Sequence, residues 1–328
     1  MGAKTGISWT GSTWNPTGGC SKTSPACARC FAETLSHRFG WTTLPWTPAN
    51  EAANVTTFPK RLEVPLRWSE PRLILVDSTA DLFHRRISDD FIAAVFAVMA
   101  RTPRHTYQVL TKRPERMRDL LSSAGFWAEV ETLAAAGLSA RASEAEHEEL
   151  ARAAGFAGSA HLLVNVALGT SIENNRFAYR ADLLRDTPAA RRFISAEPLL
   201  GSIGALDLAW IDQLIVGGES GPGARAMKMA WVEEARDCAD AAGTAFFFKQ
   251  LGVVLAHQCG LTGKGVTPAE WPPDWARHEQ PSRLSYSQVR VRENLRTEDS
   301  GRTVEERLAQ FRAIGTISDE LIPGVVRP

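Results

Sequence analysis

The amino-acid sequence predicts an α/β fold: a partial or complete (β/α) barrel with parallel strands. Three observations favour this fold. Short apolar runs alternate with segments of helical periodicity along most of the chain. Several runs, such as residues 72–77, are continuously apolar, which is typical of parallel strands buried on both faces. Polar or charged residues follow each run, and only a barrel gathers the carboxyl ends of so many strands at one mouth.

Seven strands are expected, and helices separate most of them. The expected strands are residues 7–15, 72–77, 106–110, 162–168, 192–195, 211–216 and 244–248. The expected helices are residues 31–39, 91–101, a helix from about residue 115, one ending at residue 184, and 231–242. Ser88-Asp89-Asp90 is a suitable cap for the second helix. This alternation implies a parallel sheet with right-handed crossovers.

Two segments interrupt the pattern. We expect the barrel to span residues 1–252, with a helical insertion at residues 122–160 that is rich in Ala and Glu. This insertion is a candidate surface for a protein partner. Residues 253–328 lose the alternation of strand and helix, so we expect an irregular C-terminal appendage there.

Composition excludes several classes of protein. The chain has 328 residues, and 37 Lys and Arg balance 37 Asp and Glu, so no global charge draws it to nucleic acid or to membranes. The N-terminus lacks the apolar run of a signal peptide, and no run of about eighteen apolar residues predicts a membrane span. Five cysteines, of which three are clustered, do not form a secreted disulfide framework. We expect a cytoplasmic protein without membrane contact.

The cysteine cluster follows the first expected strand. Cys20, Cys27 and Cys30 fall within eleven residues of a loop that is rich in Gly, Pro, Ser and Thr. Thiolates are soft donors, so three of them on one loop predict binding of zinc or of an iron–sulfur cluster. A structural zinc site would require a fourth ligand, for which Cys259 is a candidate. Isolated buried thiols or a disulfide agree less well with an odd trio on one loop.

Other polar residues follow the expected strands and have alternative interpretations. Lys112, with Arg113 and Arg116, forms either a cationic wall for phosphate or carboxylate or a solvated helix start. Residues 217–221 are either a ligand-binding glycine turn or a tight turn capped by Glu219. The remaining candidates face a ligand or serve as turn caps and ion pairs; they are Asp77, Ser78, Asp81, Glu173, Asn174, Glu197 and Lys249.

Five blocks of the sequence resemble one known family. They are residues 13–30, 110–117, 195–200, 217–225 and 246–250. In these blocks the chain is similar to the phage-associated three-Cys-motif family, whose function is largely unknown and which is thought to resemble radical S-adenosylmethionine enzymes. The resemblance covers residues 1 to about 252. Six residues separate Cys20 from Cys27, where the usual radical-enzyme loop has three.

The resemblance implies an iron–sulfur enzyme. Cys20, Cys27 and Cys30 would bind a [4Fe–4S] cluster, and S-adenosylmethionine would chelate its open iron and yield a 5′-deoxyadenosyl radical on reduction. We assign catalytic roles to Lys112, Glu197 and Lys249. We expect cofactor contacts from Asp77, Ser78, Asp81, Glu173, Gly217, Gly218, Glu219 and Ser220.

The substrate and partners are expectations of the same kind. The substrate would be a nucleic acid or nucleotide, and repair of damaged DNA bases is one form of this hypothesis. The electron donor would be a flavodoxin or ferredoxin. The alternative from another class is a non-catalytic nucleic-acid-binding protein that is stabilised by zinc or by a cluster.

Overall fold

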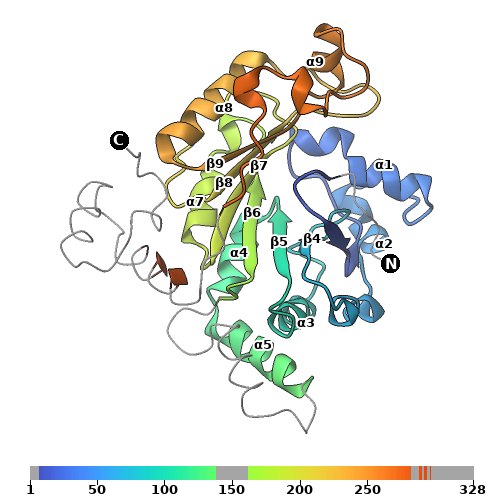
Figure 1. The fold of residues 1–328 in the computed structure, drawn as a ribbon. Coiled ribbons are helices and arrows are strands. Elements are labelled where there is room, and N and C mark those ends of the chain that lie inside the picture. Colours follow the sequence, from blue (N-terminus) through green and yellow to red (C-terminus); the bar gives the residue numbers. More distant parts are fainter. Residues whose placement is uncertain (1–6, 138–161, 282–287, 290–291, 294–295, 297–328) are drawn as a thin grey trace, which may run out of the picture.

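A computed structural model of the protein describes residues 7–137, 162–281, 288–289, 292–293 and 296. Seven parallel strands form one curled sheet in sequential order, a half-barrel whose edges are β1 and β9 (Figure 1). The strands are β1 (Ser12–Trp14), β4 (Leu73–Val76), β5 (Thr106–Thr111), β6 (Val166–Ser171), β7 (Arg191–Ala196), β8 (Gln213–Gly217) and β9 (Ala245–Gln250). The partial form of the predicted barrel is therefore confirmed.

Helices follow most of the strands along the chain, and those between β4 and β9 cover the convex face of the sheet. They are α1 (Phe31–Arg38), α2 (Glu51–Asn54), α3 (Asp89–Ala100), α4 (Pro114–Leu121), α5 (Ala124–Ala136), α7 (Tyr179–Asp186), α8 (Met229–Ala242) and α9 (Val253–Gln258). Ser88 caps α3 as predicted, because its hydroxyl accepts the N–H of Phe91 at 3.3 Å. None of the helices in the described ranges combines the length and the apolarity needed to cross a membrane.

The helical insertion is confirmed in its described part. Helix α5 follows α4 directly and packs against α3, where Phe96 makes edge-on ring contacts with Phe126 and Trp127. Residues 138–160 of the predicted insertion lie outside the described residues.

Some predicted strand ends are wrong. Strand β6 begins at Val166 rather than at residue 162, and it continues through Gly169, Thr170 and Ser171, which pair in register with β7. Strand β1 begins only at Ser12, because the chain turns at residues 8–9. In both cases the apolar run includes buried residues that precede the strand. These residues come before the first residue that pairs in register with a neighbouring strand, so the strand begins later than the apolar run does.

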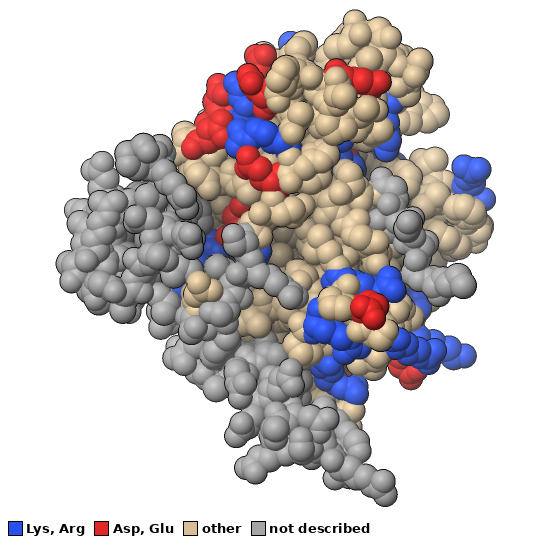
Figure 2. All heavy atoms as spheres, in the orientation of Figure 1, with Lys and Arg blue, Asp and Glu red and all other residues tan. Residues whose placement is uncertain are grey.

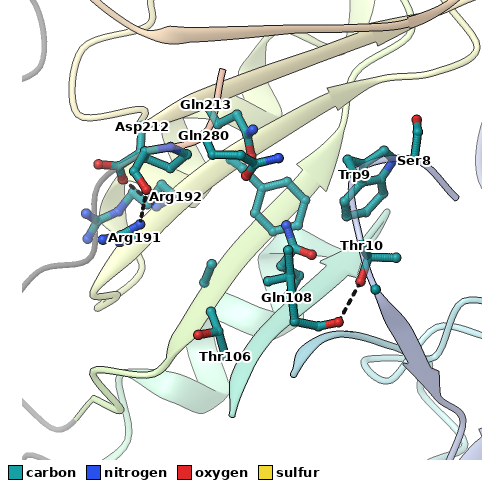
Figure 3. A pocket seen from close by; sticks show the side chains of 15 residues that line it. Ser8, Trp9, Thr10, Thr106, Gln108, Arg191, Arg192, Asp212, Gln213 and Gln280 are labelled. Atoms are coloured by element: carbon teal, nitrogen blue, oxygen red, sulfur yellow. Dashed lines mark hydrogen bonds between the residues drawn. The ribbon is translucent and has the colours of Figure 1, made fainter. Parts of the chain in front are cut away.

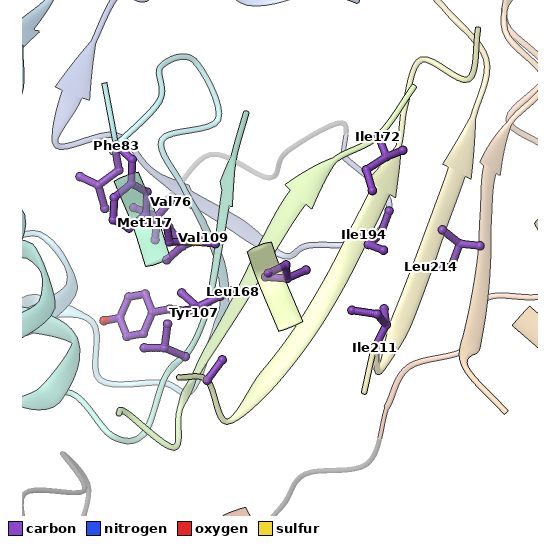
Figure 4. Packing of buried hydrophobic residues seen from close by; sticks show 14 of the residues in the cluster. Val76, Phe83, Tyr107, Val109, Met117, Leu168, Ile172, Ile194, Ile211 and Leu214 are labelled. Atoms are coloured by element: carbon purple, nitrogen blue, oxygen red, sulfur yellow. The ribbon is translucent and has the colours of Figure 1, made fainter. Parts of the chain in front are cut away.

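Alternating side chains divide the sheet into two apolar faces. The larger cluster fills the convex side beneath the helices, and Figure 4 shows Tyr107 and Val109 of β5 together with Leu168, Ile194 and Leu214 of the next strands. The smaller cluster lies on the concave side and consists of Trp9, Leu75, Phe193, Ile215 and Phe247. The concave face therefore has an apolar floor, and polar side chains lie at both of its ends.

The described part of the C-terminal segment packs on the same core. Trp271 and Trp275 are buried and make edge-on contacts with Phe248 of β9, with ring centroids 4.8 and 5.2 Å apart. Farther along, Glu293 forms a buried ion pair with Arg192 of β7 at 2.8 Å. After α9 this segment is largely irregular, as predicted.

Candidate functional site

The cysteine loop, residues 15–30, connects β1 to α1 at the carboxyl ends of the strands. A short antiparallel pair opens it, in which β2 (Thr17–Gly18) pairs with β3 (Thr56–Thr57). A single 3-10 helix, Pro25–Arg29, carries Cys27, and Cys30 is the N-cap residue of α1. The loop therefore ends at a helix N-terminus, where backbone N–H groups lack partners within the helix.

Gly19 fixes the backbone just before the first cysteine. Its φ of +75° lies in the left-handed region, and a Cβ atom there would stand 1.9 Å from the carbonyl oxygen of Asn54. No other residue type can occupy this position without moving the backbone. The local geometry that presents Cys20 thus depends on glycine.

The three thiols are free and half-buried, and they lie in different electrostatic environments. Burial and the neighbouring Asp81 carboxylate raise the pKa of Cys20 to about 12. Burial also raises the pKa of Cys30. Burial acts in the same direction on Cys27, but the ammonium of Lys112 and hydrogen bonds from the loop outweigh it, so the pKa of Cys27 is lowered. A positive charge from β5 therefore reaches the cysteine loop.

Three thiols are the donor type that a thiophilic metal prefers, but the described structure does not gather them into a metal-binding group. The charge of Cys27 contributes to raising the pKa of both Cys20 and Cys30, so the thiols are electrostatic neighbours. Within the described ranges, no three His, Cys, Asp or Glu side chains are gathered closely enough to hold a metal ion. Cys259, the candidate fourth ligand, is exposed at the end of α9. Binding would draw the three thiols together and deprotonate them.

Arg113 joins the loop to the carboxyl end of β5. Its guanidinium donates to the carbonyl and hydroxyl oxygens of Ser21 at 3.0 and 3.1 Å and to the sulfur of Cys20 at 3.4 Å. It also pairs with Asp81 at 2.7 Å, and Asp81 accepts the hydroxyl of Thr111 at 2.6 Å. Arg113, one of the cations of the predicted wall, therefore points at the cysteine loop and organises it.

A second contact network supports the same part of the loop. The Ser21 hydroxyl donates to Glu51 at 2.6 Å and lies 2.9 Å from the Nε2 of His84. Glu51 also pairs with Arg85 at 2.7 Å. Burial and the charge of nearby arginine lower the pKa of His84 to about 4, so this imidazole is neutral at physiological pH.

Strand β6 contributes an anchor through Glu173. This carboxylate is 1% exposed, accepts the N–H of Ala26 at 3.4 Å and pairs with Arg180 of α7 at 3.4 Å. Arg180 also donates to the carbonyl of Ser171 at 2.9 Å. Glu173, expected as a cofactor ligand, thus contacts the backbone of the cysteine loop.

The segment after β8 contributes a third anchor. Arg225 donates to both carboxylate oxygens of Glu219, and it also donates to the carbonyl of Pro25 at 2.9 Å. A Cβ at Gly218 would lie 2.2 Å from the Leu251 carbonyl oxygen, so this glycine admits the chain that follows β9. Ser220 is exposed. Close packing against the chain after β9 therefore explains the glycine at position 218, and the ion pair with Arg225 explains the glutamate at position 219.

The two polar residues after β4 also contact the loop. Asp77 accepts the N–H and the hydroxyl of Thr17 at 3.0 and 2.7 Å, and burial raises its pKa to about 7. The Ser78 hydroxyl donates to Asn15 at 3.1 Å. Five of the expected cofactor-binding residues thus position the cysteine loop, directly or through an arginine; they are Asp77, Ser78, Asp81, Glu173 and Glu219.

The three residues expected to be catalytic form two polar groups at the mouth. Lys112 donates to Ser171 at 3.1 Å. Lys249 pairs with Glu197 at 2.5 Å, and Gln250 donates to the same carboxylate oxygen at 3.3 Å. Leu110 and Phe247 belong to the concave apolar cluster, and each lysine lies two residues after one of them. Because side chains alternate between the two faces of a strand, Lys112 and Lys249 also lie on the concave side. Gly217 ends β8 beside the ion pair, and its Cβ would lie 3.5 Å from Glu197.

Several residues of this site escaped sequence-based prediction. Arg225 closes the glycine-rich block that also contains Glu219, and their short separation is a signal for local pairing. Ser21 and Glu51 lie 30 residues apart in irregular segments, and Ser171 was expected in a loop. No periodic pattern connects such residues, so their contacts follow only from the fold.

The fold and the site together define an α/β half-barrel protein with a thiol-bearing loop at the carboxyl ends of its parallel strands. The chain belongs to the DUF5131 family, a family of proteins of unknown function, whose model matches residues 4–310. The match includes the cysteine loop and continues well beyond residue 252. Comparison with curated proteins and with solved structures found no match for this chain.

Proposed function

We propose that this protein is an iron–sulfur enzyme that binds a [4Fe–4S] cluster through Cys20, Cys27 and Cys30 and uses S-adenosylmethionine as its cosubstrate. One observation carries the proposal: three free thiols share a single loop after the first strand of a parallel half-barrel. Ligands of barrels built from parallel strands bind at the carboxyl ends of those strands.

The anchoring contacts agree with a cluster-binding role. Side chains after β5, β6 and β8 hold the backbone of the loop at Ser21, Ala26 and Pro25. Most of these contacts do not involve the sulfur atoms. The exception is Arg113, whose guanidinium donates to the sulfur of Cys20. Arg113 partly offsets the rise in the pKa of Cys20 that burial and Asp81 cause, and a metal would displace the proton that this thiol keeps.

The concave mouth offers groups that suit an amino-acid zwitterion. When bound, the cluster would supply the electron for reductive cleavage of S-adenosylmethionine. Glu197 and Lys249 form a pair whose side chains are 17% and 14% exposed, so an incoming ammonium and carboxylate could exchange partners with them. Lys112 would add a second cation for a carboxylate or phosphate. The apolar concave floor below them would exclude water.

The test is anaerobic reconstitution with iron and sulfide. We expect about four irons per chain, broad visible absorption, and formation of 5′-deoxyadenosine and methionine after addition of S-adenosylmethionine and dithionite. Replacing Cys20, Cys27 or Cys30 by Ser should remove cluster and cleavage together. The matched controls are Cys238→Ser in α8 and Cys259→Ser after α9, which should retain both.

Two outcomes would reject the proposal. One is a reconstituted protein with fewer than about three irons per chain, and the other is a loaded protein that leaves S-adenosylmethionine intact. If the loaded enzyme is active, flavodoxin and ferredoxin should each be tested as the electron donor. Damaged DNA, undamaged DNA and free nucleotides should be tested as substrates.

A second candidate is a non-catalytic nucleic-acid-binding protein stabilised by zinc or a cluster. Its support is a group of basic side chains beside α3 on the face shown in Figure 2. The exposed residues Lys60, Arg61 and Arg67 belong to the segment between β3 and β4. Clustered cations of this kind suit a phosphate backbone.

Metal content and salt dependence separate the two candidates. The second predicts stoichiometric zinc after aerobic purification and DNA binding that weakens steeply with salt. Replacing Lys60, Arg61 and Arg67 together by Gln should reduce the slope of log affinity against log salt by about two to three. Aerobic protein free of zinc, or binding that is unchanged in this variant, would count against it.

A further inference from the structure

A cavity of about 570 Å³ lies at the opposite end of the half-barrel, near the N-terminal ends of the strands (Figure 3). Its size falls in the range of small-molecule sites. Residues from five strands and from the segments near Trp9 and Gln280 line it. Figure 3 shows Trp9, Gln108 and Gln213 around one space, with Asp212 and Arg191 at its other end.

Two aromatic rings form apolar walls of the cavity. Trp9 and Phe193 are 3% and 2% exposed, and their ring centroids are 5.9 Å apart with an interplanar angle of 54°. Tilted rings at this separation contact each other along one edge and open toward the other. Such walls suit a flat ring more than a flexible chain.

Of the buried polar atoms that lack partners in the described part of the chain, two belong to uncharged residues of the cavity. They are the indole Nε1 of Trp9 and the amide Oε1 of Gln108. Both side chains are more than nine-tenths buried, and both line the cavity. Buried donors and acceptors are normally satisfied, so an indole N–H donor beside an amide acceptor indicates a ligand that supplies the complement.

Two of the charged residues that line this space, Asp212 and Arg192, form ion pairs. Asp212 accepts the N–H of Arg192 at 2.7 Å and pairs with Arg292. Arg192 forms its ion pair with Glu293. Gln213 donates to the carbonyl of Glu279 at 2.8 Å. Arg191, which shares the concave face of β7 with Phe193, donates to the neutral carbonyl of Pro281 at 2.9 Å, so this end of the cavity also carries positive charge.

The cavity is separate from the cysteine loop. Gln108 of β5 and Lys112, which directly follows this strand, are four residues apart, which corresponds to about 13 Å along an extended chain. Leu110 lies between them on the concave face and packs with the inner apolar cluster. A ligand of ordinary size in the cavity would not reach the thiols.

From these observations we propose that the cavity binds a heteroaromatic ring of the nucleobase type. Its edge would donate a hydrogen bond to Gln108 and accept one from Trp9, while one of its faces packs on Phe193. Nucleobases carry such adjacent donors and acceptors, and glutamine reads the adenine edge in this way. The volume would accommodate a base with an attached sugar.

Calorimetric titration of the purified full-length chain tests this inference. The probes are adenine, guanine, hypoxanthine, uracil and adenosine, with indole as a ring that lacks an acceptor nitrogen. We expect at least one base to bind and to change tryptophan fluorescence. Gln108→Met, which removes the amide at similar volume, should weaken that binding by about tenfold or more, and Trp9→Phe should do the same while keeping a ring.

Matched controls make the result decisive. Gln258→Met on α9 and the exposed Trp41→Phe repeat the same chemical changes elsewhere and should leave affinity unchanged. Cys27→Ser should also leave it unchanged, so failure here is distinguishable from failure of the proposed enzyme function. The inference is overturned if no base binds at 10 mM, if both cavity variants bind like the parent, or if indole binds as tightly as the bases.

Discussion

Buried polar side chains occur at both ends of the half-barrel, at the mouth around the cysteine loop and at the base around the cavity. At the mouth, Asp81, Arg113 and Glu173 are paired with one another or with the loop backbone. At the base, Trp9 and Gln108 each carry a polar atom that meets no partner among the described residues. The apolar inner cluster separates the two ends.

Buried polar side chains have different consequences at the two ends of this fold. A polar group satisfied by the protein positions its neighbours, and here it positions a loop that carries three thiols. A polar group without a partner has a desolvation cost that only a ligand or water can offset. Substitutions at the mouth should therefore lower the stability, whereas removal of an unpartnered polar atom at the base should leave the stability nearly unchanged or raise it.

The largest effect is expected at Arg113. Arg113→Ala leaves the buried Asp81 carboxylate without its partner and frees Ser21 and Cys20. We expect a loss of about 3–5 kcal/mol in the free energy of unfolding, measured by urea denaturation. Arg118→Ala, which breaks a surface pair on the same helix, is the control and should cost less than about 1 kcal/mol. Equal losses of stability in the two variants would show that Arg113 stabilises the protein no more than a surface ion pair does.

A somewhat smaller effect is expected at Glu173. Glu173→Ala leaves the buried guanidinium of Arg180 uncompensated and removes the acceptor for Ala26. We expect a loss of about 2–3 kcal/mol and easier proteolysis within the cysteine loop. Glu173→Gln keeps an acceptor oxygen for Ala26 and should recover part of the loss. A glutamine variant less stable than the alanine variant would argue against this anchoring role.

Asp77 predicts a pH dependence at the mouth. Its pKa is about 7 in the folded protein and 3.8 in the ordinary state, so between these values the folded protein retains a proton that the unfolded chain has released. The contribution of Asp77 to stability is therefore fully present at low pH and is lost as the pH rises from about 4 to 7.

The isosteric variant isolates this contribution. Asp77→Asn can still accept the Thr17 N–H and hydrogen-bond its hydroxyl, but it carries no charge. Relative to the parent, we expect the variant to gain about 2–3 kcal/mol as the pH rises from 5 to 8. Denaturation curves at several pH values measure the difference. Parallel pH profiles for the two proteins would contradict the assigned titration.

The smallest effect on stability is expected at the base. Gln108→Met removes an amide oxygen that has no partner in the described structure and keeps nearly the same volume. We expect a change within about 0.5 kcal/mol, or a gain, in the ligand-free protein. A loss comparable to that at Glu173 would show that Gln108 serves the fold, and the contrast between the two ends would fail.

Much of the scaffold was predictable because parallel strands buried on both faces leave continuous apolar runs. The run at residues 72–77 and the Ser88 cap gave β4 and the start of α3 nearly at the observed residues. Strand ends were less predictable. Residues 162–163 are apolar because they pack beside β6, whereas Thr170 and Ser171 are polar and yet pair with β7.

In the candidate site, the three cysteines were predictable from the sequence, but the contacts of the residues around them were not. The cysteine trio is local in the chain, so its spacing alone singles it out as a donor set. The same residues that follow the strands were interpreted as cofactor ligands, because position after a strand says that a side chain lies at the mouth. It does not say what that side chain contacts there. Asp77 and Glu219 contact the loop and a neighbouring arginine, respectively.

Local chemistry in the sequence determined the α/β class, the alternation of strands and helices, and the loop with three thiols. Hydrophobic periodicity and short-range spacing carry that information, since both act between residues close in the chain. The tertiary structure alone decided that the barrel is half closed, that Arg113, Glu173 and Arg225 meet one loop, and that Trp9 and Gln108 line one cavity. Those contacts join residues up to 200 positions apart, and only the packing of the whole sheet brings them together.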